Sequence, residues 1–231
     1  MKYTNIKKAI FIERPNRFIA HAKLDGETVV AHVKNTGRCK ELLVEGAVVY
    51  LDEPQGKNRK TRYDLVAVEK RTEDGRKILI NMDSQAPNEA VAEWLPKSGL
   101  FSEGAKIRRE VTVGGSRFDF AIYENDKTTY LEVKGVTLEV DGEALFPDAP
   151  TERGVKHLRE LSSLAREGWG CAVLFVIQMK GMHCFKPNME THPEFGEALS
   201  VAANSGVRLL CYDSRITDNE MIIDQPIDII L

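Results

Sequence analysis

The sequence predicts an α+β protein made of two consecutive parts, and three observations support this. Residues 1–85 consist largely of short runs in which apolar and polar residues alternate, as β-strands do. Residues 86–231 combine such runs with two amphipathic helical segments, in the order helix, three strands, helix, strand. The charge divides at the same place. The first part has 17 lysines and arginines and 12 acidic residues, net +5, and the second part has 15 lysines and arginines and 23 acidic residues, net −8. We therefore expect two domains with different tasks.

The composition is that of a soluble globular protein, with 231 residues of which 42% are hydrophobic. No apolar run approaches the roughly 20 residues that cross a bilayer. The apolar stretch near the first residue is too short for a secretory signal. We expect a cytoplasmic protein that does not enter a membrane.

The four cysteines are widely spaced along the chain and form neither a CxxC pair nor a zinc-finger pattern. Reduced thiols are therefore expected, with neither a disulfide nor a structural zinc site. Cys171 and Cys211 lie in apolar, strand-like runs and are predicted to be buried.

The first part reads as a small barrel. Its predicted strands are residues 10–13, 17–24, 28–34, 47–53, 63–70 and 77–82. Five or six strands within about 75 residues favour a closed barrel of OB type, a fold that often binds single-stranded nucleic acid.

Two polar stretches of this barrel are candidates for contact with phosphates, KNTGRCKELL and GKNRKTR. A plain turn with a solvated arginine is the alternative for the first stretch, and a solvated loop is the alternative for the second. The candidate nucleic-acid-binding residues are Asn35, Arg38, Lys57, Arg59, Lys60 and Arg62.

Two helices are predicted in the second part. Asn88 is expected to cap the first, which runs to about Leu95 before Pro96. Thr151 is expected to cap the second, residues 152–167, which Gly168 terminates. A connection over residues 145–150 precedes this helix, and residues 171–178 form a buried strand after it.

The stretch from Ser116 to Gly135 predicts a β-hairpin. Residues 117–124 and 128–134 alternate apolar and polar side chains, and residues 125–127 separate them. Asp119 lies in the first strand. Glu132 and Lys134 lie two apart in the second and therefore point to the same face. A carboxylate from each strand can then meet beside an ammonium group.

Such an arrangement suits a divalent metal and phosphodiester hydrolysis. Mg²⁺ or Mn²⁺ prefers hard oxygen ligands, which Asp119, Glu132 and the Val133 carbonyl can supply. The metal polarises the phosphate and acidifies a bound water, and Lys134 orients that water or stabilises the developing charge. The alternative is a solvent-facing ion pair on an ordinary hairpin, because so short a pattern also arises by chance.

A polar cluster near the start of the second helix comprises Asp148, Arg153, Lys156 and His157. A helix N-terminus favours anions. Lys156 is accordingly a catalytic candidate that clamps a phosphate, and a polar helix face with an ordinary cap is the alternative.

The αβββαβ order, with an acid on the second strand and ExK on the third, resembles the PD-(D/E)XK nuclease superfamily. More narrowly, NTGR, SRFDF, LEVKGVTL, FPDAPTERGVKHLREL and FKPNMETHPEF resemble the sugar fermentation stimulation protein A (SfsA) family over nearly the full chain. The resemblance implies an OB-like domain, residues 1–85, and a restriction-endonuclease-like domain with a mixed sheet, residues 86–231. Its metal acids correspond to Asp119 and Glu132 and its lysine to Lys134. Phe118 replaces the usual proline, so the formal motif is degenerate.

The resemblance implies a metal-dependent nuclease acting on DNA, with RNA as a second substrate class. Superfamily members often add an acid from the first helix, for which Glu89 and Glu93 are candidates. A non-enzymatic DNA-binding regulator of sugar metabolism is the alternative function, and an enzyme acting on another phosphorylated substrate is a third.

Overall fold

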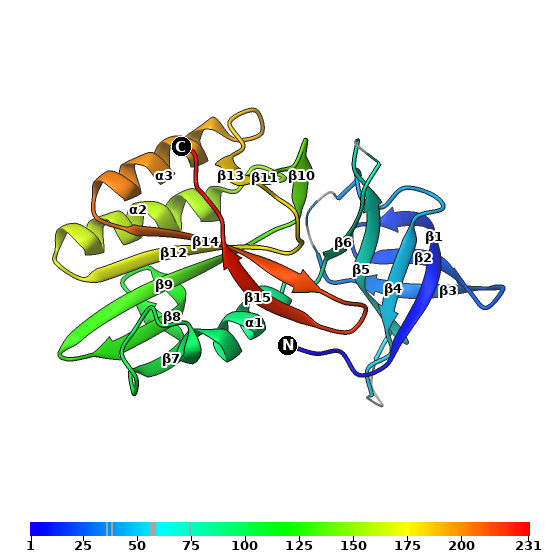
Figure 1. Cartoon of the computed structure of the whole chain (residues 1–231), viewed down its shortest axis with the longest axis horizontal. Helices are drawn as coiled ribbons and strands as arrows, with labels where there is room; N and C mark the ends of the chain where they lie inside the picture. The colour runs from blue at the N-terminus through cyan, green and yellow to red at the C-terminus, as the bar shows by residue number, and fades with distance from the viewer. Residues whose placement is uncertain (36, 38, 56–58, 74) are drawn as a thin grey trace.

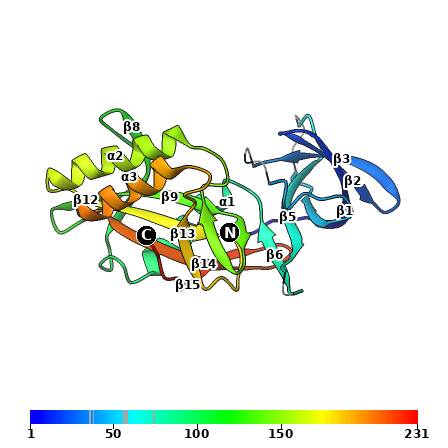
Figure 2. The ribbon, with the colours of Figure 1, turned by 90° about the horizontal axis from the view of Figure 1, so that it is seen from above.

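The computed structural model describes the chain apart from residues 36, 38, 56–58 and 74, and it has two lobes that lie side by side (Figures 1 and 2). The first lobe is built from strands β1 (Ile6–Asn16), β2 (Ile19–Leu24), β3 (Glu27–Val33), β4 (Val48–Asp52), β5 (Tyr63–Arg71) and β6 (Lys77–Asn81). The second lobe begins with α1 (Ala86–Trp94), a 3₁₀ turn (Leu95–Lys97), and strands β7 (Lys106–Val113), β8 (Ser116–Glu124) and β9 (Lys127–Val136).

The remainder of the second lobe consists of β10 (Leu138–Val140), β11 (Glu143–Phe146), α2 (Glu152–Arg166), β12 (Gly170–Ile177), β13 (Cys184–Pro187), α3 (Pro193–Asn204), β14 (Arg208–Ile216) and β15 (Met221–Pro226). This mixture of strands and helices confirms the predicted α+β class. None of the helices in the described part of the chain combines the length and the apolar composition needed to cross a membrane.

The first lobe has the strand arrangement of an OB fold. Its sheet runs β3-β2-β1-β4-β5-β6, and β3 also pairs in parallel with β5 over three residue pairs, from Ala31↔Tyr63 to Val33↔Leu65. That short pairing curls the sheet so that its edge strand β3 meets β5, the strand next to the opposite edge. The strands present small and branched apolar side chains to the interior, among them Ala20, Val49 and Leu65.

The second lobe is organised around a mixed sheet in the order β15-β14-β12-β9-β8-β7. Strand β12 pairs in parallel with both β9 and β14, and the outer pairs are antiparallel. Both faces of β12 are buried, because α2 and α3 cover one side of the sheet and α1 lies on the other (Figure 1). Parallel central strands typically show this continuous apolar pattern.

The predicted start of the first helix was wrong. Helix α1 begins at Ala86, with Pro87 in its first turn, rather than after a cap at Asn88. The Asp83 side chain accepts a hydrogen bond from the Gln85 backbone N–H (2.9 Å), which forms the turn that leads into the helix. Asn88 therefore lies inside the first turn, and its side chain is free to reach the sheet.

Several elements were not predicted from the sequence. Residues 145–150 were interpreted as a connection, yet Leu145 and Phe146 belong to β11, which pairs with β10 and β13. Lys127 belongs to β9 rather than to the hairpin turn, which Asn125 and Asp126 form. Beyond the predicted αβββαβ core, strands β14 and β15 extend the sheet and helix α3 covers one of its faces. The strands β10, β11 and β13 have three or four residues each, too few for a periodic pattern to stand out.

The two lobes are joined by a buried side-chain amide. The Nε2 group of Gln178, which follows β12, lies 2.9 Å from the Asn81 carbonyl, 3.2 Å from Asn81 Oδ1 and 3.2 Å from the Asp83 carbonyl. The Gln178 carbonyl in turn accepts from the Asn81 backbone N–H at 3.0 Å. Gln178 thus satisfies acceptors at the end of β6 that are closed off from water.

Replacing Gln178 with Ala is expected to lower the free energy of unfolding by about 1–3 kcal/mol, because buried acceptors lose their donor. Chemical denaturation monitored by fluorescence measures this. Gln85→Ala is the matched control, since Gln85 is exposed and its side chain makes no capping hydrogen bond. Equal stability of the two variants would contradict the role given to Gln178.

Candidate metal centre

The candidate centre lies where β8 and β9 separate. The two strands pair from Glu124↔Lys127 to Phe120↔Leu131, and their backbone pairing ends there. Beyond that point the Asp119 carboxylate takes the place of a backbone partner, because its Oδ2 accepts a hydrogen bond from the Val133 N–H at 2.7 Å. Asp119 is therefore held in a fork between the two strands.

Helix α1 supplies the second contact to Asp119. The Nδ2 group of Asn88 donates to Asp119 Oδ1 at 2.8 Å. Burial raises the pKa of Asp119, and the nearby charge of Glu132 raises it further. The two acids predicted to converge are thus close enough to repel each other, while Asn88 and Val133 fix the orientation of one of them.

Glu132 is buried, with 4% of its surface exposed. Its Oε1 lies 2.6 Å from Lys134 Nζ and 2.5 Å from His157 Nδ1. Burial alone would raise the pKa of Glu132, but the hydrogen bonds from His157 and Lys134 outweigh it and lower the pKa. Glu132 is therefore held as a carboxylate.

The second oxygen of Glu132 is different. Oε2 is buried, and no group in the described part of the chain donates a hydrogen bond to it. A buried carboxylate oxygen without a partner is costly, so such an atom calls for an explanation. With Asp119 nearby, the donor set consists of carboxylate oxygens, which are the ligands that Mg²⁺ and Mn²⁺ prefer. The residues therefore fit a hard divalent cation.

Close packing behind Lys134 explains the glycine of the LEVKG motif. A Cβ atom on Gly135 would lie 2.8 Å from Pro87 Cγ in α1 and would also clash with Gln178 Oε1. Only glycine lets α1 and the interlobe contact approach the strand at this position. Lys134 is thus followed directly by the glycine that packs against Gln178, the residue that joins the two lobes.

Helix α2 contributes His157, whereas Lys156 points elsewhere. Thr151 caps the helix as predicted, with its Oγ1 accepting from Gly154 N at 3.1 Å. The Lys156 side chain is 58% exposed, and its Nζ donates to the Gly115 carbonyl at 2.9 Å. Within the described residues it makes no hydrogen bond to Asp119 or Glu132. His157 reaches Glu132 because it lies beside Leu158 and Leu161 on the buried side of the helix.

The two acids considered on the first helix are occupied by other partners. Glu89 forms a two-pronged ion pair with Arg109 of β7, at 2.9 and 2.5 Å. Glu93 pairs with the amino group of Met1 at 2.7 Å. Asn88, which the sequence suggested only as a cap, is the residue of α1 that touches the centre.

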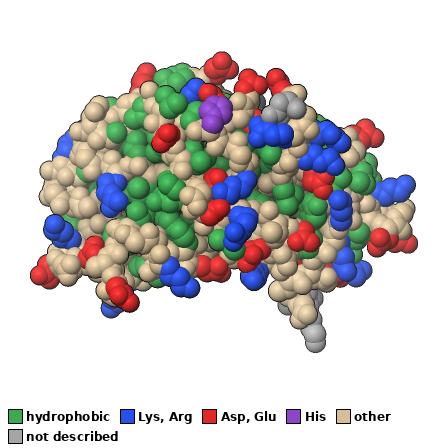
Figure 3. All heavy atoms as spheres, in the orientation of Figure 1, with side chains coloured by type: hydrophobic (Ala, Val, Ile, Leu, Met, Phe, Trp, Pro, Cys, Tyr) green, Lys and Arg blue, Asp and Glu red, His purple; other side chains and the backbone are tan. Residues whose placement is uncertain are grey.

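The candidate nucleic-acid-binding residues of the first lobe differ in whether their side chains are already bound to other groups of the protein. Arg59 pairs with Asp64, and Arg62 pairs with Glu53 at 2.6 Å. Asn35 Oδ1 accepts from the Gly37 backbone N–H at 2.7 Å, while Lys60 is exposed. Arg38 and Lys57 lie outside the described residues. On the face in Figure 3, the lysine and arginine side chains of the described residues lie among acidic ones.

The loop that carries Asn35 also meets the second lobe. A Cβ atom on Gly37 would clash with the Asp148 carboxylate, so the absence of a side chain lets this loop approach the segment that leads into α2. Gly37 and Asp148, which belong to motifs far apart in the sequence, therefore lie against each other.

Comparison with known proteins identifies the family. The model described as "Sugar fermentation stimulation protein RE domain" matches residues 85–220, and the model described as "SfsA N-terminal OB domain" matches residues 12–80. The chain belongs to the SfsA family. The predicted family and the predicted OB domain are thereby confirmed.

Relatives in this family are similar along almost the whole chain. A sugar fermentation stimulation protein homolog from Desulfitobacterium hafniense strain Y51 is 52% identical over 221 residues, covering 96% of this chain and 94% of the relative. The homolog from Clostridium beijerinckii is 48% identical over 231 residues, covering 100% of each chain.

A solved structure shares the complete SfsA fold. It is described as the structure of Pyrococcus furiosus SfsA in complex with Ca²⁺. It is 27% identical in sequence, has a TM-score of 0.87, and the match covers 100% of this chain and 98% of that one.

Proposed function

We propose that this SfsA-family protein is a cytoplasmic, metal-dependent nuclease of the PD-(D/E)XK type. It would hydrolyse phosphodiester bonds in DNA, with RNA as a second substrate class. Residues 1–85 would recruit the polynucleotide, and residues 86–231 would cut it. The observation that carries this proposal is the fork of β8 and β9, where Asp119 lies near Lys134 and near buried Glu132, one oxygen of which has no hydrogen-bond partner among the described residues.

The proposed metal ligands are Asp119, Glu132 and the backbone carbonyl of Val133. Mg²⁺ or Mn²⁺ bound there would polarise a phosphate oxygen and lower the pKa of a bound water. The complex of Pyrococcus furiosus SfsA with Ca²⁺ supports a divalent cation in this family. Asn88 and the Val133 N–H would keep the Asp119 carboxylate oriented toward the cation, since each donates a hydrogen bond to one of its oxygens.

Lys134 is the proposed electrostatic catalyst. Its ammonium group lies 2.6 Å from Glu132 and only 13% of its side chain is exposed. A cation in so dry a position would stabilise negative charge that develops on the phosphoryl oxygens more strongly than one in bulk water. His157 is the proposed positioning residue, because its hydrogen bond keeps Glu132 ionised and fixes one of its two oxygens.

Polynucleotide contacts are proposed on both lobes. Lys156 and Arg153 line a groove of about 490 Å³ along the exposed face of α2. From there Lys156 would contact a phosphate rather than the metal. In the OB domain, exposed Lys60 is the best placed of the described candidates, because Arg59 and Arg62 are paired with acids. OB domains commonly bind single strands.

The decisive experiment incubates pure protein with labelled single- and double-stranded DNA and RNA, in Mg²⁺, Mn²⁺ or EDTA. Cleavage that requires the metal is expected. A mobility shift without cleavage in any metal would overturn the nuclease proposal and favour a non-enzymatic DNA-binding regulator. Phosphate release from small esters, with polynucleotides left intact, would indicate a different phosphorylated substrate.

A further inference from the structure

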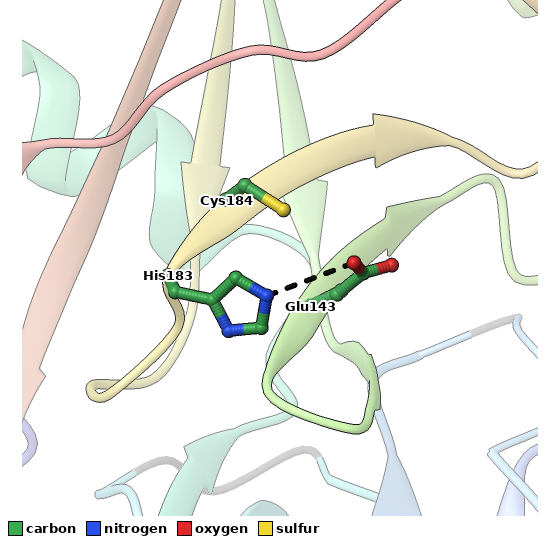
Figure 4. A group of neighbouring side chains, drawn as sticks. All are labelled: Glu143, His183 and Cys184. Atoms are coloured by element: carbon green, nitrogen blue, oxygen red, sulfur yellow. Dashed lines mark ion pairs between the residues drawn. The ribbon is translucent and has the colours of Figure 1, made fainter.

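A group of side chains of metal-ligating types lies outside the fork, in the small sheet formed by β10, β11 and β13. Glu143 at the start of β11, Cys184 at the start of β13 and the preceding His183 direct their functional groups into one space (Figure 4). One carboxylate oxygen, one imidazole nitrogen and the thiol sulfur all lie within 4.8 Å of one another. His183 Nε2 is 3.6 Å from Glu143 Oε1.

The backbone explains why these three residues converge. Strands β11 and β13 are parallel, and Glu143 and Cys184 are direct partners in their register. The His183 N–H donates to the Gly142 carbonyl at 2.9 Å, which fixes the residue before Cys184 against the β10–β11 turn. Gly142 has a φ of +79°, and a Cβ atom there would lie 2.9 Å from His183 Nδ1. Glycine therefore both forms the turn and leaves room for the imidazole ring.

The donor set separates this group from the fork. The fork offers oxygen atoms, which suit Mg²⁺ and Mn²⁺. Glu143, His183 and Cys184 offer oxygen, nitrogen and sulfur, a combination that selects borderline-soft ions such as Zn²⁺. We propose that Glu143, His183 and Cys184 form a second, structural metal site of this SfsA-family protein, specific for Zn²⁺ or a similar transition-metal ion. The thiol proton of Cys184 would pass to solvent as the sulfur binds the metal.

Lys186 is the natural competitor for this site. Its Nζ lies 2.5 Å from Glu143 Oε1, the same oxygen that faces His183. The ammonium group stabilises the carboxylate when no metal is bound, and an incoming cation has to displace it or use the other oxygen. Removing this ammonium group should therefore strengthen metal binding.

The position of the site indicates what a metal would stabilise. The β10–β11 hairpin lies on the side of the second lobe that faces the OB domain (Figure 1). Glu139 in this hairpin accepts from the Gly142 N–H at 2.9 Å and pairs with Lys70 of β5 at 2.6 Å. A metal that links Glu143 to His183 and Cys184 would fix the hairpin on β13, and through Glu139 it would fix the OB domain. The proposal does not depend on the nuclease function.

Co²⁺ titration of the full-length protein tests the site, because a cobalt–thiolate bond produces a near-ultraviolet charge-transfer band that oxygen and nitrogen ligands do not. We expect the band in the wild-type protein and in Asp119→Asn, its displacement by Zn²⁺, and no displacement by excess Mg²⁺. Cys184→Ser should abolish the band, and His183→Gln should weaken Co²⁺ affinity at least about tenfold. Cys171→Ser is the matched control, since that thiol is buried in β12.

Two further results complete the test. Zn²⁺ should raise the melting temperature of the wild-type protein but not that of His183→Gln. Because the His183 side chain is exposed, this substitution is not expected to disturb folding. Lys186→Met should bind Co²⁺ more tightly than wild type. The proposal is overturned if no band forms, if the band survives Cys184→Ser, or if it disappears equally in Cys171→Ser. Loss of nuclease activity would leave the Co²⁺ result unchanged, so the two proposals fail independently.

Discussion

Asp119→Asn is expected to lower the rate of metal-dependent DNA cleavage at least about a thousandfold, since losing a metal-ligand carboxylate removes several kcal/mol of transition-state stabilisation. The substitution keeps the size of the side chain and an oxygen that can accept from the Val133 N–H. DNA binding should therefore persist. Single-turnover cleavage and gel mobility shift, measured on the same preparation, separate the two effects.

The same variant carries a readout independent of activity. Burial and the charge of Glu132 raise the pKa of Asp119, so the fold holds that carboxylate under repulsion. Neutralising it should raise the melting temperature in EDTA. Mg²⁺ or Mn²⁺ should then stabilise the wild-type protein but not the variant. Asp126→Asn, in the exposed turn of the same hairpin, is the matched control. Unchanged cleavage in Asp119→Asn would refute the metal centre.

Lys134→Met is expected to reduce cleavage about 100- to 1,000-fold, the usual cost of removing one group that stabilises transition-state charge. Its effect on metal binding should be opposite to that of Asp119→Asn. Lys134 shares Glu132 Oε1 with His157, so removing the ammonium group eliminates a cation that competes with the metal. The melting-temperature increase caused by Mn²⁺ should be retained or enlarged, while the rate at saturating Mn²⁺ falls.

Lys127→Met is the corresponding control. Lys127 is exposed and lies at the far end of β9, where its backbone partner is Glu124 beside the hairpin turn. A variant at Lys134 that cuts DNA at the wild-type rate would exclude Lys134 from catalysis. Loss of the Mn²⁺ stabilisation in Lys134→Met would instead assign the lysine to metal binding.

The hairpin of the candidate centre was predictable because its information is local. The alternation of apolar and polar side chains predicts β8 and β9. A spacing of two residues puts Glu132 and Lys134 on the same face, where Lys134 Nζ lies 2.6 Å from Glu132 Oε1. The fork was not predictable in the same way. Which residue pair ends the β8–β9 ladder depends on the neighbouring strands β7 and β12, and no pattern within the hairpin encodes it.

The residues that orient the two acids were only partly visible in the sequence. His157 was grouped with the polar start of α2, although its position beside Leu158 and Leu161 indicates the buried face of an amphipathic helix. Asn88 looked like a helix cap because its chemistry suits that role. The Asp83 turn and Pro87 start α1 three residues earlier, so the Asn88 side chain reaches Asp119 instead.

The basic residues of the first lobe illustrate a further limit. A run such as GKNRKTR predicts positive charge at the surface, but it does not reveal which acids lie across the fold. Glu53 and Asp64 flank the loop in space and neutralise Arg62 and Arg59. The contribution of this loop to polynucleotide binding therefore depends on contacts that only the folded chain establishes.

By itself, the sequence determined the α+β class, the OB-like first part, the cap of α2 and the identity of the acids and the lysine in the hairpin. These features follow from periodicity, capping and spacing, which act over a few residues. The tertiary structure decided which side chains hold those acids, which lysines are already paired, and that Glu143, His183 and Cys184 meet. The reason is physical: parallel pairing of β11 with β13 and packing of α1 and α2 on the sheet join residues from distant segments, and no short-range pattern records those contacts.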